Sequence, residues 1–121
     1  MELKQGNLEI QENNGYKNIY PKGYPKQNIK GLEDNEYIEV EKIHESGKPH
    51  EGKYGKFYSF RVKYKDENVG FLLNTEEDNL NYTKTGPAGI KIRIIANKYT
   101  YTNHLGQEVI GTKLRFEPIT E

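Results

Sequence analysis

The sequence contains no cysteine and no tryptophan. The absence of cysteine excludes a disulfide framework, a zinc site with thiolate ligands and a cysteine nucleophile. No apolar run approaches the ~18 residues of a membrane-spanning helix. The first residues, Met1–Gln5, are not followed by the apolar stretch of a secretory signal. From these absences we expect a cytoplasmic protein without a membrane partner.

Net charge is also absent, because eighteen basic side chains balance eighteen acidic ones. Only 33 % of the 121 residues are hydrophobic, below the ~45–50 % of an average domain. We therefore expect one domain with a small core and no large enclosed cavity. The charges form blocks: segments 31–45 and 66–80 each carry −5, and segments 47–65 and 84–115 each carry +5. Two basic blocks on one face would attract a polyanion, whereas basic blocks on separate strand edges would only be solvated.

Catalytic and metal-binding patterns are missing as well. The three histidines, His44, His50 and His104, lack metal-ligand spacing. The acidic run Glu76-Glu77-Asp78 is explained by a helix N-terminus, where acidic side chains are favourable. No glycine-rich loop ends in Lys-Ser or Lys-Thr, and no Gly-x-Ser-x-Gly elbow is present. We expect no enzymatic activity, no cofactor and no metal.

The ten tyrosines and four phenylalanines favour β structure. Alternation of side chains predicts strands at 36–44, 57–65, 69–73, 89–101 and 108–116. Segment 46–56, which holds three glycines and a proline, is predicted to be a long polar loop. Thr75 followed by three acidic residues predicts a short capped helix between the third and fourth strands.

Residues 1–31 are predicted to form an N-terminal arm or an extra hairpin, with a turn at Asn13-Asn14-Gly15. Residues 32–121 hold all five predicted strands and form the main domain. We therefore expect this domain to fold without residues 1–30.

Five strands with one helix between the third and fourth is the order of the oligonucleotide- and oligosaccharide-binding (OB) barrel. The stretch Gly52–Val62, GKYGKFYSFRV, places a basic and aromatic loop before an alternating aromatic strand. It resembles the second strand of single-stranded-DNA-binding proteins of the OB fold, and the resemblance covers roughly residues 32–118. The resemblance implies a five-stranded OB-type barrel that binds single-stranded DNA or RNA largely independently of sequence, with a role in DNA replication or repair.

Alternation also divides the predicted strands into two faces. The inward set is Ile38, Val40, Tyr58, Phe60, Val62, Ile90, Ile92, Ile94, Ile110, Leu114 and Phe116. The remaining face is predicted to be cationic and aromatic, with the acidic blocks elsewhere. Rings there would stack on bases, and Lys and Arg would follow phosphates. The predicted nucleic-acid-binding residues are Lys53, Tyr54, Lys56, Phe57, Arg61, Lys63, Lys91, Arg93, Tyr99, Tyr101, Lys113 and Arg115.

A single strand is favoured over a duplex because no recognition helix, zinc finger or basic helical region is present in the sequence. The main alternative is an OB-like protein-interaction module, an inhibitor or an assembly subunit, that does not bind nucleic acid. Oligosaccharide binding is a further alternative. The choice depends on register, since a slip of one residue in a strand exchanges its two faces.

Overall fold

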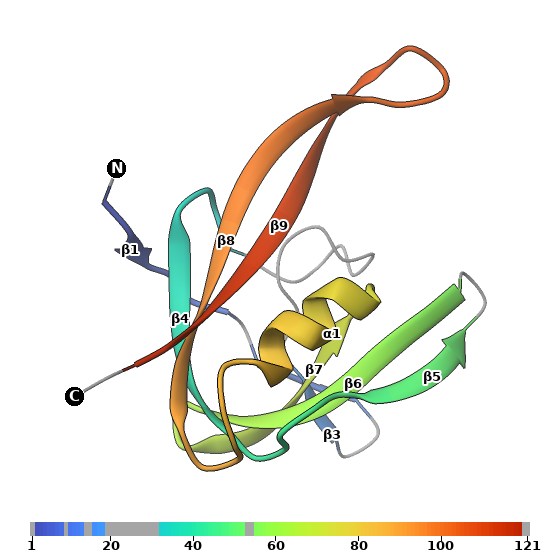
Figure 1. Cartoon of the computed structure of the whole chain (residues 1–121). Helices are drawn as coiled ribbons and strands as arrows, with labels where there is room; N and C mark the ends of the chain where they lie inside the picture. The colour runs from blue at the N-terminus through green and yellow to red at the C-terminus, as the bar shows by residue number, and fades with distance from the viewer. Residues whose placement is uncertain (1, 9, 14–15, 19–31, 53–54, 120–121) are drawn as a thin grey trace.

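The computed structural model describes residues 2–8, 10–13, 16–18, 32–52 and 55–119, which form nine strands and one helix (Figure 1). The elements in chain order are β1 (Lys4–Gln5), β2 (Gln11–Asn13), β3 (Tyr16–Asn18), β4 (Glu36–Lys42), β5 (Lys48–Gly52), β6 (Gly55–Tyr64), β7 (Glu67–Leu73), α1 (Glu76–Thr83), β8 (Lys91–Thr102) and β9 (Glu108–Pro118). The prediction of a mainly β chain with one short helix is confirmed.

The strands form one sheet, in the order β2-β3-β7-β6-β4-β8-β9. Successive strands from β7 to β9 along this path are antiparallel, whereas β3 joins β7 in parallel. Two strands lie off the path, with β1 beside β4 and β5 beside β6. Among the elements that the structure describes, β7 and β9 make no contact. The sheet is therefore open between β7 and β9 and is not closed by strand pairing.

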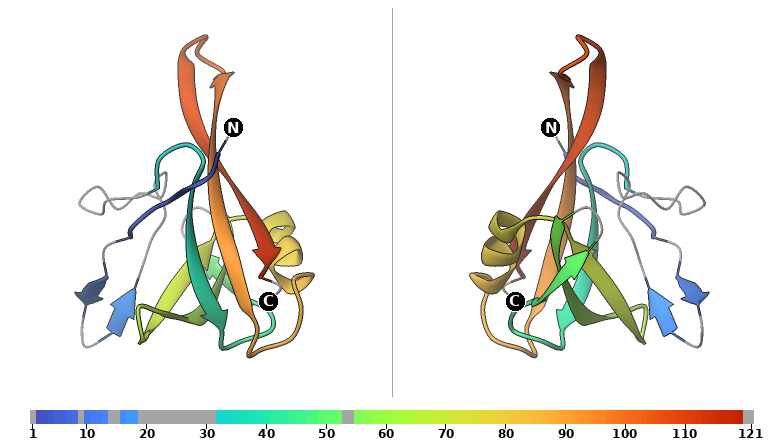
Figure 2. Two further views of the ribbon diagram at one scale, coloured as in Figure 1. Left: turned by 90° about the vertical axis from the view of Figure 1, so that its left-hand side faces the viewer. Right: turned by 90° about the vertical axis from the view of Figure 1, so that its right-hand side faces the viewer.

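Strand β4 connects the two halves of the sheet. Its residues Glu36–Glu41 pair with β8, and Glu41 and Lys42 pair with β6. The last pair between β4 and β8 is Glu36 with Ala96, but β8 continues to Thr102. The β8–β9 hairpin therefore extends past the end of β4, and Figures 1 and 2 show it projecting away from the other elements.

Segment 46–56 is not the long loop that the sequence predicts. Its residues Lys48–Gly52 form β5, which pairs with the start of β6 from Lys48 opposite Ser59 to Gly52 opposite Gly55. β5 pairs only with β6, so it lies at a sheet edge, where proline is tolerated because one side of the strand needs no hydrogen-bond donor. The prediction was wrong because proline and glycine are typical of loops, and this edge strand contains Pro49 and lies among the glycines.

The helix begins where the sequence predicts. Thr75 is its N-cap, and the Thr75 hydroxyl oxygen accepts a hydrogen bond from the Asp78 backbone N–H at 3.1 Å. The helix contacts β6 and β7 on one side and β9 on the other. Buried Tyr82 makes much of this contact, with its ring centroid 4.0 Å from that of Phe60 and 5.8 Å from that of Phe116. Helix α1 thus covers the opening between β7 and β9.

Most of the predicted core is observed. Besides the expected residues, the core cluster contains Leu8, Leu32, Tyr64, Val69, Phe71, Leu73, Tyr82 and Ala96. Ile90 and Phe116 are only partly buried, at its margin. The inward assignment of Ile110 is wrong, since this residue is 70 % exposed. Ile110 lies opposite Thr100, beyond the last residue of β4 that pairs with β8, so no other strand covers it.

Two residues depart from alternation of hydrophobic and polar side chains. Ile95 is fully buried although its strand position places it on the opposite face from Ile94. Lys42 has the parity of Ile38 and Val40 and is 1 % exposed. The Lys42 ammonium group donates to the carbonyl oxygens of Tyr82 at 3.1 Å and Gly86 at 2.6 Å. A buried cation thus satisfies carbonyls at the C-terminal end of α1.

Burial lowers the pKa of Lys42, and the carboxylate of Glu45 partly offsets this effect. The Lys42 ammonium group also lies 4.3 Å from the centroid of the Tyr82 ring, in the geometry of a cation–π contact. The lysine therefore connects β4 to the helix through both the backbone and the ring of Tyr82.

The described part of residues 1–31 contributes to the main domain. Strands β2 and β3 form an antiparallel hairpin on β7. Leu8 is a core residue, 1 % exposed, and its backbone N–H donates to the Tyr64 hydroxyl at 3.0 Å. Gly6 allows the N-terminal segment to pack closely against Leu32, because a Cβ at position 6 would lie 2.4 Å from Leu32 Cδ2. The predicted arm thus contributes a core residue, and folding of residues 32–121 without it stays a prediction.

Candidate nucleic-acid interface

The strand register places nine of the twelve predicted binding residues on one face of the sheet, since directly opposed residues in paired strands share a face. We call this the outer face. The nine residues are Phe57, Arg61, Lys63, Lys91, Arg93, Tyr99, Tyr101, Lys113 and Arg115.

Of the other three predicted residues, the structure describes only Lys56, and it does not lie on this face. Lys56 has the parity of Tyr58, opposite to that of Phe57, and its ammonium group lies 5.9 Å from the Tyr58 ring centroid. Lys53 and Tyr54 lie outside the described residues.

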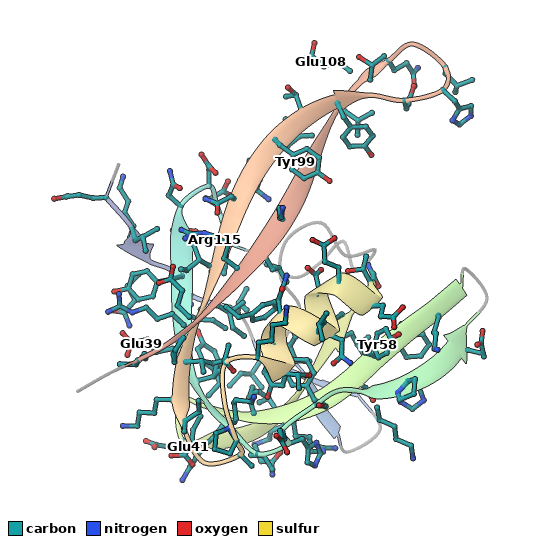
Figure 3. All side chains as sticks on the ribbon, in the orientation of Figure 1. Glu39, Glu41, Tyr58, Tyr99, Glu108 and Arg115 are labelled. Carbon is teal, nitrogen blue, oxygen red and sulfur yellow. The ribbon has the colours of Figure 1, made fainter. Side chains whose placement is uncertain are left out.

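The prediction that the outer face carries no acidic residue is wrong. Strand β4 lies between β6 and β8, so Glu41 sits directly between Lys63 and Lys91. Glu39 and Glu117 both lie opposite Arg93 in the same way. Figure 3 labels Glu39 and Glu41 on this central strand. The acidic strand divides the cations of β6 from those of β8 and β9.

Several cations of the outer face are engaged within the fold. The Arg93 guanidinium lies 3.5 Å from the Glu39 carboxylate and 4.5 Å from the centroid of the Tyr37 ring. Arg115 donates to Asn97 Oδ1 at 3.1 Å and to the Glu117 carboxylate at 2.9 Å. Both arginines are therefore already engaged with side chains of the same face.

Three lysines of this face are exposed and extend into solvent: Lys63, Lys91 and Lys113. Within the described ranges, no carboxylate forms an ion pair with any of them. They are therefore the cations of the outer face best placed to bind an anionic ligand.

The projecting part of the β8–β9 hairpin, residues 97–113, carries two exposed aromatic rings, and we call it the ribbon. Tyr99 is 49 % and Tyr101 is 46 % exposed, and their ring centroids are 5.8 Å apart with an interplanar angle of 35°. The Tyr99 ring lies across Gly111 on the opposite strand, where a Cβ would come within 2.5 Å of Tyr99 Cζ. Figure 3 shows Tyr99 on this ribbon, beyond the sheet.

A second ring pair lies at the other hairpin that extends from the sheet. His50 on β5 stacks on Phe57 on β6 with centroids 5.0 Å apart and an interplanar angle of 16°. The His50 Nε2 is also 2.7 Å from the Ser59 hydroxyl oxygen. Sequence reasoning missed His50 because it placed this residue in a loop. Lys48, His50 and Gly52 are spaced two residues apart, as on one face of a strand, and they precede an alternating strand. This spacing was the signal that could have identified the strand.

The ribbon tip differs in composition from the rest of the chain. Between Tyr99 and Thr112, Glu108 is the only residue with a formal charge when His104 is neutral, although 30 % of all residues are charged. Leu105 and Ile110, 69 % and 70 % exposed, also lie there. The exposed side chains of the tip are therefore aromatic, aliphatic or uncharged polar, apart from Glu108, and the cations lie only at the base of the ribbon.

Comparison of the chain with protein-family models, curated sequences and solved structures gave no significant match. Within the described residues, no cluster of three or more His, Cys, Asp or Glu side chains could hold a metal ion. No helix in the same part of the chain is long and apolar enough to cross a membrane.

Proposed function

We propose that the chain is an OB-type domain that binds single-stranded nucleic acid on its outer face. The sheet order β7-β6-β4-β8-β9, with α1 between β7 and β8, supports the fold assignment, because it is the strand order of an OB barrel opened at one seam. In that architecture, oligonucleotides bind the outside of the second and third strands between the two long hairpins. Here those strands are β6 and β7, and the hairpins are β5–β6 and β8–β9.

The observation that carries the proposal is the pair of exposed rings, Tyr99 and Tyr101, on a ribbon that no other described element covers. Neither ring belongs to the core cluster, so packing of the core does not explain their presence. Bases stack on such rings with ~1–3 kcal/mol each, and every base offers a flat face. This favours binding that is largely independent of sequence.

The cations also support binding on the outer face, but fewer of them can contact phosphates than the two +5 segments of the sequence indicate. Lys63, Lys91 and Lys113 are exposed on it, whereas Arg93 and Arg115 are engaged with carboxylates. We therefore propose about three phosphate contacts, with stacking supplying most of the affinity.

A single strand suits this surface better than a duplex. The described helix, α1, has three acidic residues in its first turn and is packed between β9 and β6 through Tyr82. It has no basic face that could enter a major groove.

The test is fluorescence anisotropy of the purified chain with labelled oligo-dT, oligo-U and a duplex of equal length. We expect both single strands to bind more tightly than the duplex. Tyr99→Ala and Tyr101→Ala should each weaken single-strand binding about 5- to 150-fold. Leu105→Ala, at an exposed apolar site on the same hairpin, is the matched control and should bind normally. Wild-type affinity in both tyrosine variants would disprove the proposed site.

The alternative is a protein-interaction module, and one observation favours it. Leu105 and Ile110 are aliphatic, highly exposed and close to the ribbon tip, and exposed apolar groups of this kind occur at protein interfaces. If this alternative holds, the chain binds no oligonucleotide even at low salt, and Leu105→Ala and Ile110→Ala reduce binding to the partner.

A further inference from the structure

The outer edge of β9 presents unpaired backbone groups. The Ile119 N–H donates to the Lys91 carbonyl at 2.9 Å, and the Asn103 N–H donates to the Gln107 carbonyl at 2.9 Å. Each pair continues the β8–β9 register by one residue, at its two ends, and so marks a hydrogen-bonded pair. Because such pairs alternate in an antiparallel ladder, the odd-numbered residues of β9 bond to β8. The even-numbered residues point their N–H and C=O groups away from it.

Leu114 and Phe116 are the even-numbered residues near the middle of this edge. In the part of the chain that the structure describes, β9 pairs only with β8, and α1 is its only other neighbouring element. No hydrogen bond from a described residue reaches the outward N–H or C=O group of Leu114 or Phe116. An edge of this kind is a template for one more strand.

A groove runs along the same edge. One wall is β9 from Lys113 to Pro118, and the other is the C-terminal part of α1 with Asn81, Lys84 and Thr85. Figures 1 and 2 show α1 lying beside β9 at the open side of the sheet. The groove therefore offers backbone groups for pairing and the partly buried ring of Phe116 for apolar contact, whereas the Leu114 side chain is buried in the core.

The charges of the groove select the ligand. Lys84 and Lys113 are both exposed there, and the acidic side chain of the groove, Glu117, is already paired with Arg115. We propose that this groove binds an extended, acidic segment of a protein partner, which adds to β9 as an edge strand. Alternate side chains of the segment would contact the lysines, and the backbone would bond to Leu114 and Phe116.

Pro118 defines one end of the binding site. Proline has no backbone N–H, so the outward face of β9 offers donors at Thr112, Leu114 and Phe116 but none at position 118. The added strand therefore pairs with segment 112–116. This inference does not rest on the proposed nucleic-acid function, because the rings of the ribbon take no part in it. Lys113 is the one cation common to both proposed sites, so the charge test uses Lys84, which belongs to the groove alone.

The probe is a fluorescently labelled, end-blocked heptapeptide of alternating valine and glutamate, compared with the same peptide carrying lysine in place of glutamate. We expect the acidic peptide to bind the full chain at least about ten-fold more tightly than the basic one. Lys84→Glu should weaken acidic-peptide binding about five-fold or more, whereas Lys91→Glu, the same charge change on the outer face, should not.

Backbone pairing is tested with two proline variants on the free edge. Thr112→Pro removes an outward donor inside the proposed site, and Ile110→Pro removes one outside it. Neither breaks a backbone hydrogen bond to β8. Thr112→Pro removes only the side-chain bond in which the Thr112 hydroxyl accepts from Lys98 Nζ, so both variants should unfold cooperatively near the wild-type temperature. Only Thr112→Pro should weaken peptide binding.

Three results would overturn the inference. The first is that neither peptide binds, or that both proline variants bind alike. The second is that oligo-dT displaces the acidic peptide and that Lys84→Glu weakens oligo-dT binding as strongly as it weakens peptide binding. This result would make the groove part of a nucleic-acid site. The third is that the chain dimerises on sedimentation and Thr112→Pro abolishes the dimer, which would make a second copy the occupant. Loss of oligonucleotide binding in the tyrosine variants, with peptide binding intact, separates the two sites.

Discussion

Tyr99 and Gly111 face each other across the β8–β9 ladder, and the phenol ring of Tyr99 occupies the space where a side chain at Gly111 would begin. A cross-strand ring over a glycine protects the glycine backbone from water. The absence of a side chain at Gly111 thus determines where the Tyr99 ring lies. A substitution at position 111 should therefore alter the proposed binding site although both tyrosines are kept.

Gly111→Ala should therefore reduce single-strand binding by displacing the Tyr99 ring. We expect a loss approaching the ~1–3 kcal/mol of one stacked base. The melting temperature should change little, because the ribbon lies outside the core cluster. Ile110→Ala, at the neighbouring residue on the opposite face, is the control for anisotropy and thermal unfolding. Normal oligo-dT binding by Gly111→Ala would argue against a role for the Tyr99 ring in that position.

The affinity for oligo-dT should depend only moderately on salt. With Lys63, Lys91 and Lys113 contacting one phosphate each, the slope of log affinity against log salt should be about −2, from ~0.7 per phosphate. Titrations between low and moderate salt give this slope directly. A slope steeper than about −4 would mean that the engaged arginines also release their carboxylates to bind phosphate.

Leu8→Ala should destabilise the whole domain. Leu8 is buried in the core cluster, and leucine-to-alanine changes at such sites cost ~2–5 kcal/mol. Chemical denaturation monitored by tyrosine fluorescence measures the free energy of unfolding. Leu105→Ala, the same change at an exposed position, should cost less than about 0.5 kcal/mol. Equal stability of the two variants would show that the N-terminal segment is not needed by the core.

Lys42→Met should also destabilise the domain, although it removes a buried charge. Methionine has a similar length but no donor, so the Gly86 carbonyl would lose its hydrogen bond from Lys42, whereas the Tyr82 carbonyl would keep those from Thr85. Leaving a buried carbonyl unpaired costs ~1–3 kcal/mol. Lys84→Met, at the exposed C-cap of the same helix, is the comparison and should be close to neutral. A more stable Lys42→Met variant would mean that burying the charge costs more than its hydrogen bonds contribute.

Asp78 should make stability depend on pH. Burial raises the pKa of Asp78; a hydrogen bond with Thr75 opposes this effect, Glu77 adds to it and Lys113 opposes it. The folded chain therefore keeps the Asp78 proton to a higher pH than the unfolded chain does. The resulting stabilisation is fully present below the ordinary pKa of 3.8 and is lost as the pH rises through the folded-state pKa.

The measurement is the free energy of unfolding of wild type and Asp78→Asn at several pH values from 3 to 7. Asparagine does not titrate, so the stability of wild type relative to the variant should fall as the pH rises. A difference that stays constant with pH would contradict this assignment.

Local signals in the sequence predicted the elements well. The alternation around Phe60 and Ile92 gave the strands, and Thr75 with three acidic residues gave the helix start. Each of these signals depends on residues within a few positions of one another, which is why a single sequence is enough to detect them.

The arrangement of the strands could not be read in the same way. Glu41 lies between Lys63 and Lys91 because β4 pairs with two strands that are distant in the sequence. Alternation within one strand carries no information on such neighbours. Ile110 has the pattern of an inward residue, but the length of the hairpin relative to β4 leaves it exposed. Lys42 was unexpected because only the end of α1, more than thirty-five residues away in sequence, makes its burial favourable.

The ribbon extends past the end of β4, and this position determines which substitutions it can accept. From Lys98 to Thr112, each cross-strand neighbour is another ribbon residue, so substitutions there need not satisfy the packing of the core. Tip sequences of different length or ring content should be exchangeable on the same base, with folding left to the remaining strands. The fold thereby separates the residues that determine stability from those that are free to acquire a new ligand.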